Sequence, residues 1–146
     1  EDVFVRSFFT PGHFTASAFV LSPEGDAILL VKHPKLGRWL QPGGHVEPED
    51  RDLASAALRE AREETGLTDL TFLSPDIFDV DVHVIPARKD EPEHKHFDVR
   101  FAFKSPTRAL TLEEGITGAR WVPLHAVTPE NSDASVTRAA GKLARG

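Results

Sequence analysis

The feature of the chain that most restricts its fold and its chemistry is the stretch from Gly43 to Leu67, GGHVEPEDRDLASAALREAREETGL. It begins with a glycine turn and runs into a segment with the residue pattern of a helix. Glu60, Glu63 and Glu64 stand at i, i+3 and i+4, so their carboxylates can point to one side of that helix. Three carboxylates at this spacing repel each other. A divalent cation that prefers oxygen ligands would relieve the repulsion.

Residues on both sides of these carboxylates support the helical interpretation. Asp50 or Asp52 can cap the N-terminus, and Gly66 stands where a glycine commonly ends a helix. Between them runs a stripe of mostly small apolar residues, which lets a helix lie close on a sheet. The stripe comprises Leu53, Ala54, Ala57, Leu58 and Ala61.

The rest of the chain reads as short strands separated by turns. Segments 13–21 and 27–32 are apolar and flank a Ser-Pro-Glu-Gly-Asp turn, which predicts a hairpin. Segments 77–85 and 95–103 alternate apolar and polar residues and predict a second hairpin around a charged loop. Three further elements are expected: an extended piece at 39–41, a strand at 119–122, and a C-terminal helix over 131–145 capped by Asn131 or Ser132. One α/β domain over residues 1–146, with a mixed β-sheet, fits this order.

Composition excludes several classes of protein. The formal net charge of −6 weighs against sequence-independent binding to nucleic acid, which needs a basic surface. The chain has no cysteine, which excludes disulfides, thiolate metal sites and a cysteine nucleophile. No apolar run approaches the length of a membrane span, so no membrane partner is expected. No signal-peptide pattern opens the chain, and a cytoplasmic location is the plain interpretation.

The segment Arg59–Leu67, REAREETGL, resembles the second half of the Nudix hydrolase signature, G-x5-E-x7-R-E-U-x-E-E-x-G-U, where U is aliphatic. It matches every fixed position, with Ala61 as a small residue at the first U position. The order of the surrounding predicted elements is also similar to that of the family. The resemblance therefore covers most of the chain and implies a Nudix-type α/β/α sandwich.

The first half of the signature departs from the family pattern, because one extra residue lies between Gly44 and Arg59. Counting forward from Gly44 places Asp50 at the acidic position, whereas counting back from Arg59 places Arg51 there. Two other carboxylates, those of Glu47 and Glu49, lie close by. The sequence leaves open which residue replaces the family glutamate.

The resemblance implies an enzyme that cleaves a diphosphate linkage in a nucleoside diphosphate derivative, with Mg²⁺ or Mn²⁺ as cofactor. By similarity to the family, the metal ligands are Glu60, Glu63, Glu64 and the backbone carbonyl of Gly43. Arg59 would hold a glutamate in place by a charge-assisted hydrogen bond. The general base would come from the helix, as Glu60, or from a later loop, as Glu113 or Glu114. The residues that the resemblance implies for catalysis are Glu60, Arg59 and Glu114.

Residues outside the signature are weaker candidates for contact with substrate. The candidate substrate-contact residues are Arg38, Trp39, His45, His96 and Asp98. For each of them, surface solvation or packing is the competing interpretation. His94 and His96 form a His-x-His pair that can chelate a metal from a strand, although such residues are more often surface groups.

Two other classes of function compete with the hydrolase. A non-catalytic Nudix-fold module that binds a nucleotide or regulates a partner would share the fold, but the motif carboxylates are all present here. An isoprenoid diphosphate isomerase also shares the fold, but that chemistry is associated with a catalytic cysteine. The expected partner is a small nucleotide derivative of undetermined identity. A homodimer is common in the family, and nothing in the sequence requires one.

Overall fold

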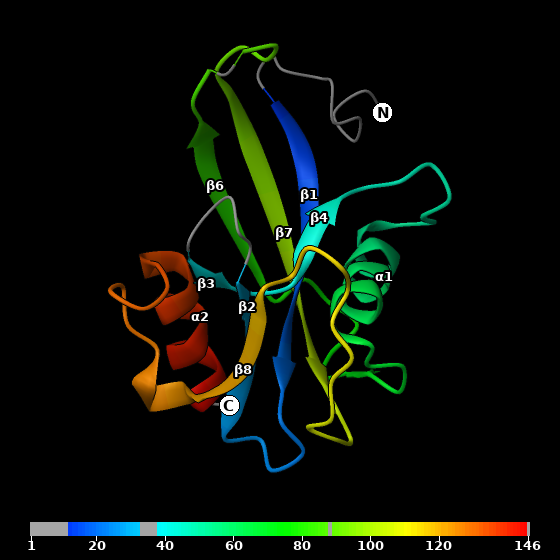
Figure 1. Cartoon of the computed structure of the whole chain (residues 1–146), viewed down its shortest axis with the longest axis vertical. Helices are drawn as coiled ribbons and strands as arrows, with labels where there is room; N and C mark the ends of the chain where they lie inside the picture. Colours follow the sequence, from blue (N-terminus) through cyan, green and yellow to red (C-terminus); the bar gives the residue numbers. More distant parts are fainter. Residues whose placement is uncertain (1–11, 33–37, 88, 146) are drawn as a thin grey trace.

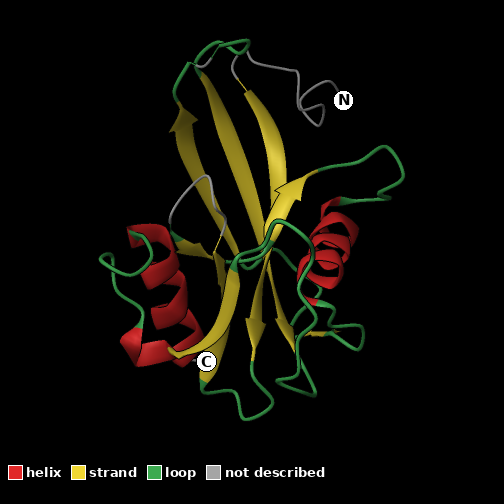
Figure 2. Cartoon of the chain, viewed as in Figure 1, coloured by secondary structure: helices red, strands yellow, loops and turns green. Residues whose placement is uncertain are grey.

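The computed structural model describes residues 12–32, 38–87 and 89–145 of the 146-residue chain. In these ranges a mixed β-sheet lies between two helices, α1 (Leu53–Thr65) and α2 (Ala134–Ala144) (Figure 1). Figure 2 shows the strands as one layer with a helix on either side. The predicted α/β/α sandwich is therefore confirmed. Neither helix has the length and apolar character needed to cross a membrane, and the described ranges contain no other α-helix.

Two long strands form the centre of the sheet. β1 (Gly12–Leu21) pairs in parallel with β7 (His94–Lys104) along its whole length. The second predicted hairpin is confirmed, since β6 pairs antiparallel with β7. The remaining strands are β2 (Ala27–Lys32), β3 (Trp39–Leu40), β4 (Gly43–His45), β5 (Thr71–Phe72), β6 (Asp79–Ile85) and β8 (Gly118–Pro123), and a 3-10 turn spans Leu124–Ala126. β5 had no counterpart in the sequence prediction, because Thr71 and Phe72 are too short a pattern to be recognised.

Helix α1 is closed at both ends by the residues that the sequence offered for this role. The Asp52 carboxylate accepts a hydrogen bond of 2.7 Å from the Ser55 backbone N–H, so Asp52 rather than Asp50 is the N-cap. Gly66 adopts the left-handed conformation at φ +76°, where a residue with a side chain would be strained.

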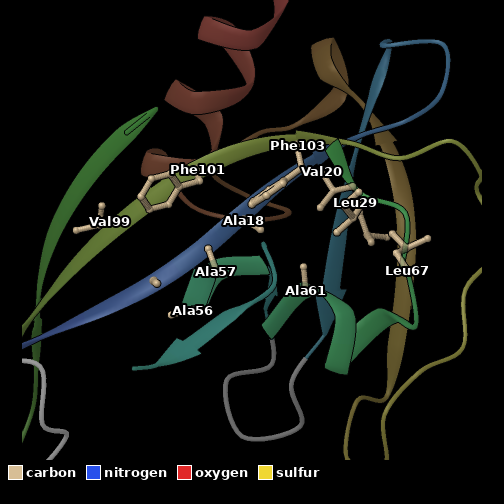
Figure 3. Packing of buried hydrophobic residues seen from close by; sticks show 12 residues of the cluster. Ala18, Val20, Leu29, Ala56, Ala57, Ala61, Leu67, Val99, Phe101 and Phe103 are labelled. Carbon is tan, nitrogen blue, oxygen red and sulfur yellow. The ribbon is translucent and has the colours of Figure 1, made fainter. Parts of the chain in front are cut away.

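The small residues of α1 let it approach the sheet closely. Ala56, Ala57 and Ala61 are fully buried against β1 and β7, in a core that includes Ala18 and Phe103 (Figure 3). Such close contact fixes the rotation of the helix about its axis. The glutamates at its C-terminal half are thereby held at a defined position beside the sheet.

Helix α2 begins later than expected, and its predicted caps were wrong. Asp133 is the N-cap, and its carboxylate accepts a hydrogen bond of 2.8 Å from the Val136 backbone N–H. Asn131 instead closes the preceding turn, where its side chain accepts from the Thr128 N–H and donates to the Ala126 carbonyl. Several nearby residues can each form a local cap-like bond, and the sequence does not rank them.

The glycine pair before α1 forms a strand rather than the predicted turn. In β4, Gly43 lies opposite Ser17 and Gly44 lies opposite Ala16 in an antiparallel pair with β1. A Cβ atom at Gly43 would stand only 2.4 Å from the Ser17 Cβ, so the backbones approach more closely than side chains would permit. The glycines serve close approach and not a reversal of the chain.

The polar faces of β6 and β7 are directed into the molecule. Val80, Val82 and Val84 of β6 are each at least 50% exposed, whereas Asp98 and Arg100 of β7 are 5% and 2% exposed. The odd-numbered residues of β1 share this face, because Phe19 packs in the core beside α2 while Ala18 packs beside α1. On its α2 side the sheet therefore carries polar and ionisable groups of β1, β6 and β7 beside an apolar cluster that packs on α2.

Candidate metal and catalytic site

Arg59 joins the carboxylates of the Nudix-like segment into one network. Its guanidinium donates two hydrogen bonds to Asp50, at 2.9 and 3.0 Å, and further bonds to Glu63 at 2.8 Å and Glu60 at 3.1 Å. It also donates to the His45 backbone carbonyl at 3.0 Å. Hydrogen bonding to Asp50 raises the pKa of Arg59 above its usual value. The guanidinium is thus held as a cation in contact with three carboxylates.

Asp50 is the acidic residue between Gly44 and the helix whose carboxylate pairs with Arg59. Burial raises the pKa of its carboxyl, but the hydrogen bonds from Arg59 and the Glu47 N–H, together with the charge of Arg59, hold the pKa below its usual value. Its side chain is only 5% exposed. The carboxylate also accepts a hydrogen bond of 2.8 Å from the Glu47 N–H, which folds the extra residue into a tight loop. The insertion is therefore absorbed before the helix and does not displace Arg59.

Glu60 and Glu64 face the glycine strand. The Gly43 N–H donates to Glu64 Oε1 at 3.3 Å, and a Cβ atom at Gly44 would stand 1.6 Å from Glu60 Oε2. Glu64 is 6% exposed, whereas the Glu63 side chain is 48% exposed. The three glutamates therefore differ in environment although they share one side of α1.

Burial and mutual repulsion make the inner carboxylates poor anions in the absence of a cation. Burial raises the pKa of Glu64 to about 8, and the charge of Glu60 adds to the effect. Burial also raises the pKa of Glu60 to about 7, against the opposing charge of Arg59. Crowded and largely buried carboxylate oxygens fit a hard divalent cation such as Mg²⁺. Gly44 leaves space beside Glu60 that any side chain would fill.

The loop predicted to carry a general base lies beside these glutamates. The Glu113 N–H donates to the Glu64 backbone carbonyl at 3.2 Å, and the Thr111 N–H donates to the Thr65 carbonyl at 2.9 Å. The charge of Glu113 is among the causes of the raised pKa of Glu64. Glu114 follows in an exposed turn that Gly115 completes at φ +96°.

A cavity of about 710 Å³ opens on the other face of the sheet. Of the predicted substrate-contact residues, Arg38, His45 and His96 line it. A smaller hollow of about 170 Å³ at β4 is lined by Gly43, Gly44, His45 and His96 among others.

Trp39 and Asp98, the other two predicted substrate-contact residues, make packing contacts and hydrogen bonds within the protein. Trp39 is partly buried and packs against the apolar cluster beside α2, and the Arg120 guanidinium lies 4.2 Å from its ring centroid. The Asp98 carboxylate accepts hydrogen bonds from Thr15 at 3.0 Å, Ser17 at 2.8 Å and Arg100 at 2.9 Å. The packing interpretation therefore accounts for Trp39, and the buried network accounts for Asp98.

A model of the family described as the NUDIX domain matches residues 11–140. The chain belongs to the Nudix family. It is accordingly a Nudix hydrolase, of the class that acts on phosphorus anhydrides.

Solved structures of other Nudix proteins share the fold at low sequence identity. An Ap4A hydrolase from C. elegans, in a binary complex, is 20% identical with a TM-score of 0.66, over 90% of this chain and 95% of that chain. The dihydroneopterin triphosphate pyrophosphohydrolase of E. coli is 15% identical with a TM-score of 0.68, over 91% and 96%. The Nudix domain of Shewanella oneidensis NrtR, complexed with ADP-ribose, is 20% identical with a TM-score of 0.60, over 88% and 86%.

Sequence reasoning missed two polar side chains of this Nudix fold. His13 is 1% exposed and lines the cavity, and the Gln41 amide donates to Ser17 Oγ and to Asp98, both at 3.3 Å. The alternation of β1 places His13, Thr15 and Ser17 on one face, which was a usable signal. The sequence did not give the parallel register that sets His13 opposite His96.

The crowded carboxylates predict a pH dependence for the metal-free protein. Their folded-state pKa values, about 7 for Glu60 and about 8 for Glu64, lie above the ordinary value of 4.5. The neutral forms therefore contribute stability below pH 4.5 that is lost as the pH rises through 8. In EDTA, Glu64→Gln is expected to be more stable than the unmodified chain at pH 8, by about 1–3 kcal/mol.

Thermal unfolding between pH 5 and pH 8.5 measures this difference. The two proteins should converge toward pH 5, and added Mg²⁺ should stabilise the unmodified chain most at high pH. Glu130→Gln, which changes an exposed carboxylate before α2, is the matched control. If the unfolding temperatures of Glu64→Gln and of the unmodified chain depend on pH in the same way, burial does not raise the pKa of Glu64.

Proposed function

We propose that this Nudix chain hydrolyses a diphosphate linkage in a nucleoside diphosphate derivative, using a divalent cation held by α1. One observation carries the proposal: the carboxylates of Glu60 and Glu64 lie together beside the side-chain-free strand Gly43-Gly44, and Glu64 is only 6% exposed. Repulsion between such carboxylates costs stability, and groups with raised carboxyl pKa values gather at functional sites.

The proposed ligands are the carboxylates of Glu60, Glu63 and Glu64 and the backbone carbonyl of Gly43. A bound Mg²⁺ or Mn²⁺ supplies charge neutralisation for the phosphates and lowers the pKa of a coordinated water. Arg59 keeps Glu60 and Glu63 oriented through its two hydrogen bonds of 3.1 and 2.8 Å. The Gly43 N–H orients Glu64. The protein's own part is thus to hold three anionic oxygens in place before substrate arrives.

We place the general base in the loop beside α1, with Glu60 as the alternative on the helix. Within that loop we favour Glu113 over Glu114, because the Glu113 N–H donates to the Glu64 backbone carbonyl at 3.2 Å and the charge of Glu113 acts on Glu64. A carboxylate there can accept a proton from a water that attacks phosphorus near Glu64.

Single replacements in the loop rank these candidates. Glu113→Gln should lower kcat by at least about 10²-fold, while Glu114→Gln should leave it within about 3-fold of the unmodified enzyme. Steady-state kinetics with saturating Mg²⁺, with thermal unfolding as a fold control, give the ranking. The reverse order would return the role to Glu114, and two fully active variants would exclude the loop and leave Glu60.

The substrates and ligands of the similar proteins define the class of compound to test. They are Ap4A, dihydroneopterin triphosphate and ADP-ribose, each of which contains a phosphoanhydride. Each of those proteins is 20% identical or less, so the class and not the compound is proposed for this chain. Arg38, exposed at the rim of the cavity, is the proposed contact for a phosphate or sugar.

Phosphate and nucleotide release across a panel of such compounds tests the proposal. The panel should include nucleoside triphosphates, dinucleoside polyphosphates, nucleotide sugars and ADP-ribose, each with Mg²⁺, with Mn²⁺ and with EDTA. We expect turnover of at least one compound that requires a divalent cation. Tight binding of a nucleotide without turnover in any condition would instead favour the non-catalytic binding module.

A further inference from the structure

Five histidines gather on the face of the sheet opposite α1. His13 of β1 lies directly opposite His96 of β7, and His83 of β6 lies opposite His96 on its other side. His45 of β4 pairs with Thr15, two residues along β1 from His13. His94 precedes His96 by two residues and so shares its face. Four strands therefore each direct an imidazole to one place.

Three of these imidazoles are arranged closely enough to share an ion. One ring nitrogen from each of His13, His45 and His96 lies within 4.8 Å of the other two. The ring centroids are 4.6 Å apart for His13 and His96, 5.1 Å for His13 and His45, and 5.5 Å for His45 and His96. Three nitrogens around a tetrahedral Zn²⁺ stand about 3.3 Å apart, given Zn–N distances of 2.0–2.1 Å.

The remaining adjustment is small and the residues can make it. His45 and His96 are only half-buried, so their rings can rotate and bring the ring nitrogens from within 4.8 Å to about 3.3 Å of one another. His13 is 1% exposed and provides a fixed point. The backbone pairing of β1 with β4 and β7 holds the three Cα atoms in register. The site is thus mostly formed before an ion binds.

We propose that His13, His45 and His96 bind a transition-metal ion of the Zn²⁺ type, at a centre separate from the carboxylates of α1. Neutral imidazole suits Zn²⁺, Co²⁺, Ni²⁺ and Cu²⁺, whereas Mg²⁺ and Mn²⁺ prefer the oxygens of Glu60 and Glu64. The two ligand sets lie on opposite faces of the sheet, so each can select its own ion. The proposal does not depend on hydrolase activity.

Two further histidines, His94 and His83, lie beside the three proposed ligands. His94 stacks on His13 at 5.2 Å and is held through its Nδ1, which is 2.9 Å from the Pro92 carbonyl. His83 lies 5.4 Å from His96, with its Nδ1 3.4 Å from Asp81.

The three proposed ligands leave one position of a tetrahedral ion for another group. All three imidazoles line the cavity of about 710 Å³, so this fourth position lies toward the cavity. Three protein ligands with an open position are the arrangement of zinc sites that bind a water or a substrate oxygen. The competing interpretation is a cluster of neutral histidines that only pack against each other.

Metal binding distinguishes the two interpretations without any assay of activity. Chelator-treated protein is titrated with Zn²⁺ in excess Mg²⁺ by calorimetry, and with Co²⁺ by visible absorption, which reports four-coordinate geometry. Because the chain has no cysteine, no thiolate can contribute to the cobalt spectrum. We expect one Zn²⁺ per chain and the intense absorption of four-coordinate Co²⁺.

Variants assign the ion to the three histidines. His45→Ala and His96→Ala should each weaken Zn²⁺ binding by at least about 100-fold, since each removes one ligand. His125→Ala, which changes an exposed histidine on the 3-10 turn, and Glu64→Gln on α1 should leave it unchanged. Thermal unfolding of each apo variant verifies the fold, and the half-buried positions of His45 and His96 make these replacements milder than one at His13.

Three outcomes would overturn the proposal. They are no Zn²⁺ binding by the unmodified chain, binding that survives both histidine replacements, and binding that is lost in Glu64→Gln but kept in the histidine variants. The last would place the ion on the carboxylates of α1. A negative result here leaves the panel of phosphoanhydride substrates to decide the hydrolase function separately.

Discussion

Glu64→Gln is expected to abolish hydrolysis, with a fall in kcat of at least about 10³-fold. The side chain is 6% exposed and its Oε1 accepts the Gly43 N–H, so glutamine fits the same space and can keep that hydrogen bond. The change removes one negative charge from the proposed metal ligands and little else. Turnover of the best compound in the panel, measured at saturating Mg²⁺, gives the effect.

The fold should survive this replacement, because it relieves repulsion between buried carboxylates. Glu63→Gln should also reduce turnover strongly. The Glu63 side chain is 48% exposed, so water can reach the site of the lost charge more easily than at Glu64. Glu130→Gln is the control and should be fully active. A Glu64→Gln enzyme with full activity would remove α1 from the catalytic centre.

Loss of the Asp50–Arg59 pair should reduce kcat/KM by about 10–100-fold. Asp50→Asn breaks a buried two-point contact with the guanidinium, which then no longer holds Glu60 and Glu63 in the same orientation. Arg59→Lys should fall in the same range, because an ammonium cannot form the planar two-point contact. Kinetics across a Mg²⁺ titration should show a raised requirement for metal, which a purely structural role would not produce.

This prediction also decides which residue completes the Nudix signature. Arg51 is exposed and stands one position beyond Asp50, so Arg51→Ala should leave both kcat/KM and the metal requirement unchanged. If Arg51→Ala is as damaging as Asp50→Asn, the damage comes from the loop as a whole and not from the carboxylate.

Much of the fold was predictable because local patterns agree with it. The stripe of small residues predicted the buried face of α1, and Gly66 predicted the C-terminus of this helix. The alternation in β6 and β7 gave their faces and their pairing. The signature of nine residues from Arg59 to Leu67 gave the family, since it constrains chemistry as well as helix geometry.

Other parts of the site depend on contacts between distant residues and could not be predicted. Asp50 pairs with Arg59 only because a hydrogen-bonded loop absorbs the inserted residue. The strand β4 exists because Gly43 approaches Ser17, a contact that no local pattern records. His13 meets His96 through a parallel pairing across more than eighty residues of chain. Each of these features is a property of register, which composition and periodicity leave open.

Manganese binding to α1 tests the central claim most directly. Electron paramagnetic resonance of free Mn²⁺, titrated with protein at several pH values, reports the number of bound ions and their affinity. We predict that the unmodified chain binds Mn²⁺ more tightly as the pH rises through 7 to 8, because Glu60 and Glu64 must first lose their protons. The Glu60→Gln/Glu64→Gln double variant should bind at least about 100-fold more weakly. Equal Mn²⁺ affinity in the two proteins would contradict the proposed metal centre.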